Sequence, residues 1–206
     1  MNTAKIICLF SLVALAASPR SSPTPAHRTD INPAMLYYQA FQVAPDLSQA
    51  DRDFLFDTEW RGQKLPPRVG ELLSRYDDLF RLVRQAADAT VPCDWGIDMT
   101  PGPATLLPHL ARGKMITLTA RLRTLWSLQE GRPEDARDDL LAAFALGRNI
   151  SRDGTLIAAV VQVALENIVC STIAENFYAF PPETLKEISS GMARAPVRGT
   201  MAACAA

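Results

Sequence analysis

The sequence predicts an all-α protein of six to seven antiparallel helices, arranged either as an array of helical hairpins or as an irregular bundle. Two observations support this fold class directly. Apolar residues recur every three to four positions over most of the chain after residue 31, which is the period of helices that bury one face. Alternating apolar and polar runs of useful length, which would indicate strands, are absent from the sequence.

Residues 1–17 are expected to form a cleaved secretory signal peptide. Lys5 supplies the positive charge, and residues 6–17 form an apolar core of about twelve residues. Ala14 and Ala16 provide a small-x-small cleavage pattern. The apolar run is shorter than the roughly 20 residues that a spanning helix needs. We therefore expect an exported protein, periplasmic or secreted, with no membrane span after cleavage; an uncleaved signal that holds the chain at the membrane is the alternative.

Composition indicates one globular domain at residues 31–206, joined to the signal by a Ser/Pro-rich linker at 18–30. Hydrophobic residues make up 48% and charged residues 21% of the chain. The net charge is −1, and the loss of Lys5 with the signal would lower it by one more. This charge balance gives no reason to expect a nucleic-acid partner or an acidic tail.

The first three helices are predicted from their ends and their apolar spacing. Asn32-Pro33 starts a helix that stops at Pro45, since Asn caps free amides and Pro suits the first turn. Ser48 starts a short second helix, with Asp51 as its capping partner. Residues 69–87 are then expected to form one helix of over four turns, because their apolar residues keep helical spacing throughout.

The second half of the chain follows the same logic. Residues 91–103 break the helical pattern, and a helix is expected from about 106 to 130, with Gly113 as a candidate break. Gly131-Arg132-Pro133 is a tight turn into the next helix, which ends at Asp153-Gly154. Residues 155–179 are the most apolar stretch of the mature chain and are expected to form a central core helix.

The C-terminal region is expected to contain two short helices. Pro181-Pro182 starts one of them, and Thr200 caps a second that reaches Ala206. The last helix stops without a cap or a polar tail. A complete chain and a truncated one are both consistent with this ending.

Residues 120–148 resemble the second half of a tetratricopeptide repeat. Gly131, Ala136, Leu140 and Ala143 keep the spacing of that motif. Arg123 and Thr124 depart from it, and no second copy is found 34 residues away. A general helical hairpin and a degenerate repeat therefore both remain open. More broadly, the chain resembles exported helical proteins of bacteria, a resemblance that implies no activity.

Cysteine and histidine provide few candidates for chemistry. Loss of Cys8 with the signal leaves three cysteines that could supply one disulfide and one free thiol, with the pairing open: Cys93, Cys170 and Cys204. No other His, Cys or acidic residue lies at metal-ligand spacing from His109 in the sequence, and no phosphate loop, Cys-x-x-Cys or His-Glu-x-x-His motif is present. We therefore expect no metal and no cofactor.

Two functions follow, and the sequence does not decide between them. The favoured one is a non-enzymatic scaffold that binds a protein or peptide in a groove between helices, formed by the hairpin 114–149, which includes Trp126, and the 91–103 loop. The alternative is an exported hydrolase. Asp94 and Asp98 would supply its carboxylates, and Trp95 between them could stack a sugar. This pattern assigns no catalytic residue.

Overall fold

The computed structural model describes residues 27–56, 58–102 and 105–199, and within these ranges the regular structure is entirely helical. The elements are α1 (Pro33–Gln42), α2 (Gln49–Phe56), α3 (Pro67–Ser74), α4 (Asp77–Ala87), α5 (Pro108–Gln129), α6 (Pro133–Ile150), η2 (Ser151–Asp153), α7 (Leu156–Glu175), η3 (Phe177–Ala179) and α8 (Pro182–Arg194). The all-α prediction is confirmed, with more helices than expected. The predicted signal peptide, most of the linker and the helix at Thr200 lie outside the described residues.

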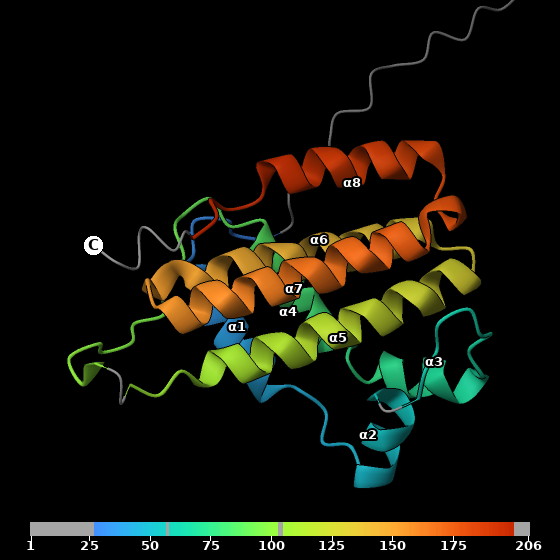
Figure 1. Ribbon diagram of the computed structural model, residues 1–206, viewed down its shortest axis with the longest axis horizontal. Helices are drawn as coiled ribbons and strands as arrows, with labels where there is room; N and C mark the ends of the chain where they lie inside the picture. Colours follow the sequence, from blue (N-terminus) through green and yellow to red (C-terminus); the bar gives the residue numbers. More distant parts are fainter. Residues whose placement is uncertain (1–26, 57, 103–104, 200–206) are drawn as a thin grey trace, which may run out of the picture.

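Helix α6 lies at the centre of the domain, where it contacts α4, α5, α7 and α8 (Figure 1). α1 packs on α4, and α3 packs on α5. α2 and α3 lie together along the edge of the domain below α5 in this view. The arrangement is a bundle around one central helix.

The predicted hairpin of α5 and α6 is confirmed. Gly131 has φ +69°, a left-handed conformation that L side chains rarely adopt, and it allows the chain to reverse between the two helices. Ala136 and Ala143 are fully buried. Gly113 does not interrupt α5; a Cβ atom there would lie 2.1 Å from Ile150 Cδ1, so the glycine lets α6 approach closely.

The predicted helix starts also hold for α1 and α2. Asn32 Oδ1 accepts a hydrogen bond from the Ala34 amide at 3.1 Å. The Ser48 hydroxyl accepts from the Asp51 amide at 3.1 Å and donates to the Asp51 carboxylate at 2.8 Å. These side chains satisfy amides that have no partner within the helix.

The single helix predicted for residues 69–87 is wrong, because the chain turns at Arg75 and Tyr76 to form α3 and α4. The Tyr76 amide donates to the Leu73 carbonyl, and the Phe80 amide to the Tyr76 carbonyl. Asp77 then occupies the first turn of α4, where the helix dipole favours an acid. The apolar spacing continues across the turn, so periodicity alone does not reveal it.

The central position predicted for residues 155–179 is also wrong. α7 packs on α5 and α6 with one face only, and its opposite face is exposed. Among the described residues α7 is the one helix long and apolar enough to cross a membrane, a test that core helices also pass. The most apolar of the described helices therefore lies at the surface of the domain.

Candidate functional site

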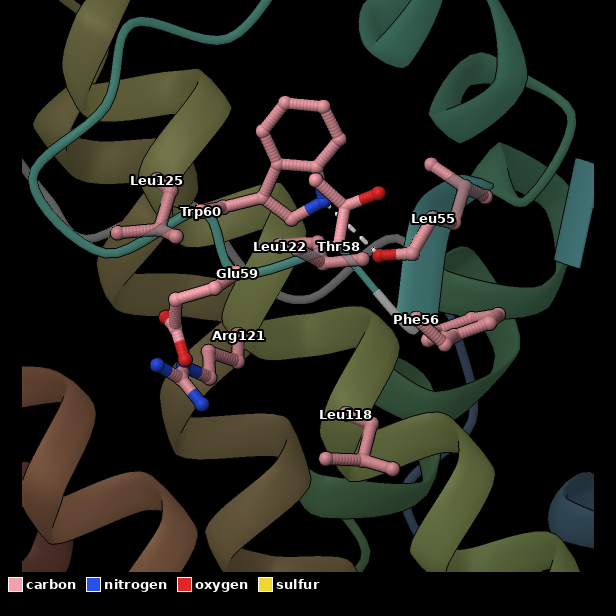
Figure 2. A pocket seen from close by; sticks show the side chains of 9 residues that line it. All are labelled: Leu55, Phe56, Thr58, Glu59, Trp60, Leu118, Arg121, Leu122 and Leu125. Atoms are coloured by element: carbon pink, nitrogen blue, oxygen red, sulfur yellow. Dashed lines mark hydrogen bonds between the residues drawn. The ribbon is translucent and has the colours of Figure 1, made fainter. Parts of the chain in front are cut away.

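A small pocket, lined by both apolar and polar residues, lies between α2, the loop that follows it and α5 (Figure 2). Its cavity volume is about 160 Å³. We call it the α2–α5 pocket, and it is lined by Leu55, Phe56, Thr58, Glu59, Trp60, Leu118, Arg121, Leu122 and Leu125. Four of its residues come from α5, in the predicted hairpin 114–149, whereas the 91–103 loop contributes none of them.

Trp60 forms one wall of this pocket in a defined orientation. Its indole Nε1 donates to the Leu55 carbonyl at 3.0 Å, and Phe54 packs edge-on against its ring at 5.4 Å. Trp60 is only 8% exposed. The Trp60 side chain is thus held in place by the helix that precedes it.

The rim of the pocket is charged. Figure 2 shows Glu59 and Arg121 at its edge. Arg121 also lies 3.4 Å from the Glu175 carboxylate, which Arg61 approaches at 3.1 Å. The chain immediately after Glu175 exposes two aromatic side chains, Phe177 and Tyr178. An apolar floor with a charged rim suits a binding site.

The 91–103 loop does not assemble a catalytic group. Asp94 and Asp98 are exposed, and each Oδ1 accepts a hydrogen bond from the backbone amide two residues later. His109 is fully buried, with its ring stacked 4.5 Å from that of Trp95. The three titratable groups therefore do not converge, and both carboxylates serve turns of the loop.

Trp95 belongs to the core instead of a surface cleft. It is 4% exposed, and its indole donates to the Asn149 carbonyl at 2.8 Å. Its ring lies within 6.3 Å of the rings of Tyr37, Tyr38 and Phe41. Trp95 thus anchors the loop to α1 and α6. In this conformation its faces are occupied by protein, so they are not offered to a ligand.

Trp126 lies apart from Trp95 and outside the α2–α5 pocket. It is half-buried and covers Gly70 of α3, where a Cβ atom would come within 2.3 Å of the indole ring. It also lines a second cavity of about 150 Å³, shared with Asp77, Arg123 and Arg132. The four residues predicted to bind a ligand are therefore not gathered in one place.

The two described cysteines are free thiols, so the Cys93–Cys170 pairing is not formed. Cys93 is buried, and burial raises the pKa of its thiol to about 12. Cys170 is exposed on α7, where partial burial and then the charge of Glu166 raise its pKa. Cys204 lies outside the described residues.

A buried carboxylate joins three helices beside the second cavity. Asp139 of α6 is fully buried and accepts hydrogen bonds from Arg84 Nε of α4 at 2.8 Å and from Arg123 Nε of α5 at 2.7 Å. Burial by itself lowers the pKa of Arg123, but Asp139 and Asp77 outweigh it and raise the pKa. Each carboxylate oxygen of Asp139 pairs with one of the two arginines, so we interpret this cluster as a structural contact that joins α4, α5 and α6.

Fold and site together define a small helical domain with an apolar pocket and a charged rim. The chain matches no protein family, no curated protein and no solved structure. Across residues 27–56, 58–102 and 105–199, no three His, Cys, Asp or Glu side chains lie close enough to hold a metal ion. Sequence reasoning missed the pocket because it forms between segments about 60 residues apart. The local signal was the apolar face expected for the second helix, to which Phe54, Leu55 and Trp60 contribute.

Proposed function

We propose that the protein is a non-enzymatic scaffold that binds a peptide segment of a partner protein by taking one apolar side chain into the α2–α5 pocket. The observation that carries this proposal is the pocket itself: a leucine-lined cavity of about 160 Å³ with Glu59 and Arg121 at its rim. An apolar cavity of about 150 Å³ accommodates benzene. The pocket therefore matches one leucine or phenylalanine side chain, and it is smaller than typical small-molecule sites of roughly 300 Å³ or more.

The rim and the exposed aromatics suit a peptide main chain. The Arg121 guanidinium can donate to a peptide carbonyl, and the Glu59 carboxylate can accept from a peptide amide. Phe177 and Tyr178 are 50% and 99% exposed at the end of α7. Exposed aromatic side chains are typical of interfaces. We infer that the bound segment continues from the pocket toward these two residues.

The hydrolase alternative has less support from the geometry. It requires titratable groups that meet at a reacting atom, whereas Asp94 and Asp98 accept hydrogen bonds from their own turns. If the purified protein hydrolysed an oligosaccharide and Asp94→Asn or Asp98→Asn abolished that activity, the alternative would replace the scaffold.

The proposal also includes export of the protein and a repeat-like character of the α5–α6 hairpin. The basis for export is the signal-like pattern of residues 1–17, and cell fractionation with N-terminal sequencing tests it. The basis for a repeat-like hairpin is the antiparallel packing of α5 and α6 around Gly131, Ala136 and Ala143. An exported scaffold of this kind would meet its partner outside the cytoplasm.

A peptide array tests the pocket. The array holds Gly/Ser peptides that differ only in one central residue, and affinity is measured by calorimetry. Central Leu or Phe should bind at least about 10-fold more tightly than central Ala, because burying such a side chain contributes about 1.5–3 kcal/mol. The variant Leu118→Gln should remove this preference.

Leu128→Gln is the matched control. Leu128 lies on the same helix and is also half-buried, but it does not line the pocket. Its substitution should leave the preference for Leu or Phe unchanged. Equal binding of all central residues, or equal loss in both variants, would show that the pocket does not carry the function.

A further inference from the structure

A larger cavity lies between the end of α1, the loop that leads into α2, the turn from α3 to α4 and the start of α5. Its volume is about 470 Å³, within the range of roughly 300–1,000 Å³ that is typical of small-molecule sites. Among the residues that line the α2–α5 pocket, it shares Phe56 alone. We call it the Tyr76 cavity, and its walls include Phe41, Arg52, Phe56, Tyr76, Arg112 and Met115.

Tyr76 brings to this cavity a hydroxyl group that lacks a partner. The residue is 3% exposed, but its hydroxyl makes no hydrogen bond to any other described residue. Buried hydroxyl groups are normally hydrogen-bonded, because an unpaired one is costly. Burial raises the pKa of this phenol, and the charges of Arg52 and Arg75 offset the rise only in part. The hydroxyl therefore keeps its proton at neutral pH and can donate a hydrogen bond to a ligand oxygen.

The charged side chains of the cavity leave one positive charge without a counterpart. Arg52 and Arg112 line it together with a single acid, Asp46, whose side chain is 97% exposed. Arg52 Nε donates to the Leu47 carbonyl at 3.0 Å, and its Nη2 pairs with the Asp46 carboxylate at 2.9 Å. Arg112 forms no ion pair within the part of the chain that the structure describes. The lining thus carries a net charge of +1, which a single anionic group would balance.

The remaining walls offer apolar surface. Phe41 and Phe56 are half-buried aromatic side chains, and Met115 presents a half-buried thioether. Aromatic rings and methionine sulfur both make favourable contacts with another aromatic ring. A ligand that suits this cavity therefore combines one negative charge with an apolar, preferably aromatic, body.

We propose that the Tyr76 cavity binds a small aromatic monocarboxylate. The carboxylate accepts a hydrogen bond from the Tyr76 hydroxyl and pairs with Arg112, whose guanidinium matches the geometry of a carboxylate. The ring packs against Phe56 and Met115. A dianion such as phosphate would overcompensate the single positive charge and has no apolar part for these walls. This site is independent of the peptide binding proposed for the α2–α5 pocket.

Calorimetry of the full chain at pH 7 tests the class of ligand, with 3-phenylpropionate as the probe. Two related compounds separate its charge from its ring: 3-phenylpropanamide keeps the ring without the charge, and acetate keeps the charge without the ring. We expect saturable binding of the acid, at least about 10-fold tighter than that of the amide, because hydrogen bonds to charged groups are the stronger ones. Acetate should not saturate the site over the same concentration range.

Two variants test the residues that hold the carboxylate. Tyr76→Phe removes the hydroxyl but keeps the ring and breaks no hydrogen bond to a described residue, so the urea midpoint should stay unchanged while the affinity for the acid falls about 10-fold. Arg112→Gln should weaken binding of the acid by at least about 10-fold and leave that of the amide unchanged. Lys114→Gln is the matched control for charge, since Lys114 is an exposed cation two positions along α5 that does not line the cavity. It should have no effect.

Leu118→Gln separates the two sites, because Leu118 lines the α2–α5 pocket and not the Tyr76 cavity. It should leave binding of the acid unchanged even where it removes the preference for a peptide side chain. Four results would overturn the proposal: no saturable binding of 3-phenylpropionate, equal affinity for the acid and the amide, an affinity that Tyr76→Phe or Arg112→Gln does not lower, or an equal loss in Lys114→Gln or Leu118→Gln.

Discussion

α6 and α7 are consecutive α-helices of 18 and 20 residues that pack on each other. The more charged of the two, α6, is the more buried, and the more apolar, α7, is the more exposed. α6 carries six charged residues and occupies the centre of the domain, where even Asp139 is fully buried. α7 carries only Glu166 and Glu175 as charged residues, yet it leaves one apolar face exposed. The share of apolar residues in each helix therefore does not predict which of the two is more buried; what decides it is how many other helices surround each one.

The difference follows from what each neighbour supplies. α6 tolerates a buried carboxylate because Arg84 and Arg123 reach it from the helices on either side. A paired and hydrogen-bonded charge can be buried, whereas an unpaired one cannot. α7 has packed neighbours on one side only, and its outward apolar side chains have no partner within the described chain.

The largest effect should come from breaking the ion cluster of α6. Asp139→Ala leaves Arg84 and Arg123 without their buried partner, and we expect a loss of about 3–5 kcal/mol in the free energy of unfolding. Urea denaturation measures it. Asp138→Ala is the matched control, since Asp138 is the adjacent acid and is 41% exposed in its pair with Arg137; it should cost about 0–1 kcal/mol. Equal losses would show that burial of the pair does not matter.

A smaller effect should separate the two faces of α7. Leu165 is 1% exposed, so Leu165→Ala should destabilise the domain by about 2–5 kcal/mol. Val163 is two positions away but 48% exposed, and Val163→Ala should stay within about 0.5 kcal/mol. Thermal denaturation measures both. If Val163→Ala were as costly as Leu165→Ala, the outer face of α7 would be packed after all.

The mildest test compares the two free thiols at pH 8. Cys170 is exposed, whereas Cys93 is 6% exposed with a pKa of about 12. Cys170 should therefore react with iodoacetamide at least 10-fold faster, because the thiolate is the nucleophile. Mass spectrometry of digested samples gives both rates.

Cys93 also predicts a pH dependence with a definite sign. Once unfolded, its thiol loses its proton near the ordinary pKa of 9.0, whereas the folded protein retains it up to about 12. The unfolded state thus binds fewer protons in this window, and stability should fall as pH rises from 9 to 12. Cys93→Ala should reduce this slope; an unchanged slope would assign it to other groups.

Much of the fold could be predicted because helix ends and helix faces are local features. Ser48 and Gly131 mark their turns through a hydrogen bond and a backbone conformation that involve nearby residues, and Asn32 caps its helix through the Ala34 amide while also bonding the backbone of Asp94. The division at Tyr76 was missed because the apolar spacing runs through it. A change in helix direction of this kind depends on which helices lie on each side.

The candidate site was less predictable for the same reason. Asp94, Trp95 and Asp98 form a chemically suggestive group in the sequence, but the Trp95 side chain turns inward to Tyr37 and Asn149. The α2–α5 pocket is lined by Trp60, Leu118, Arg121 and their neighbours, which come from two segments about 60 positions apart. No local pattern indicates that they meet.

The helical class, the positions of most helix ends and the hairpin around Gly131 follow from the sequence, because they depend on hydrogen bonds and spacing within a few residues. The packing of the folded chain is needed to see that α6 is central, that α7 keeps one apolar face exposed, and that a pocket lies between α2 and α5. Burial depends on which segments pack together in space. The sequence of a helix shows that it has an apolar face, but not whether another segment packs against that face or which one does.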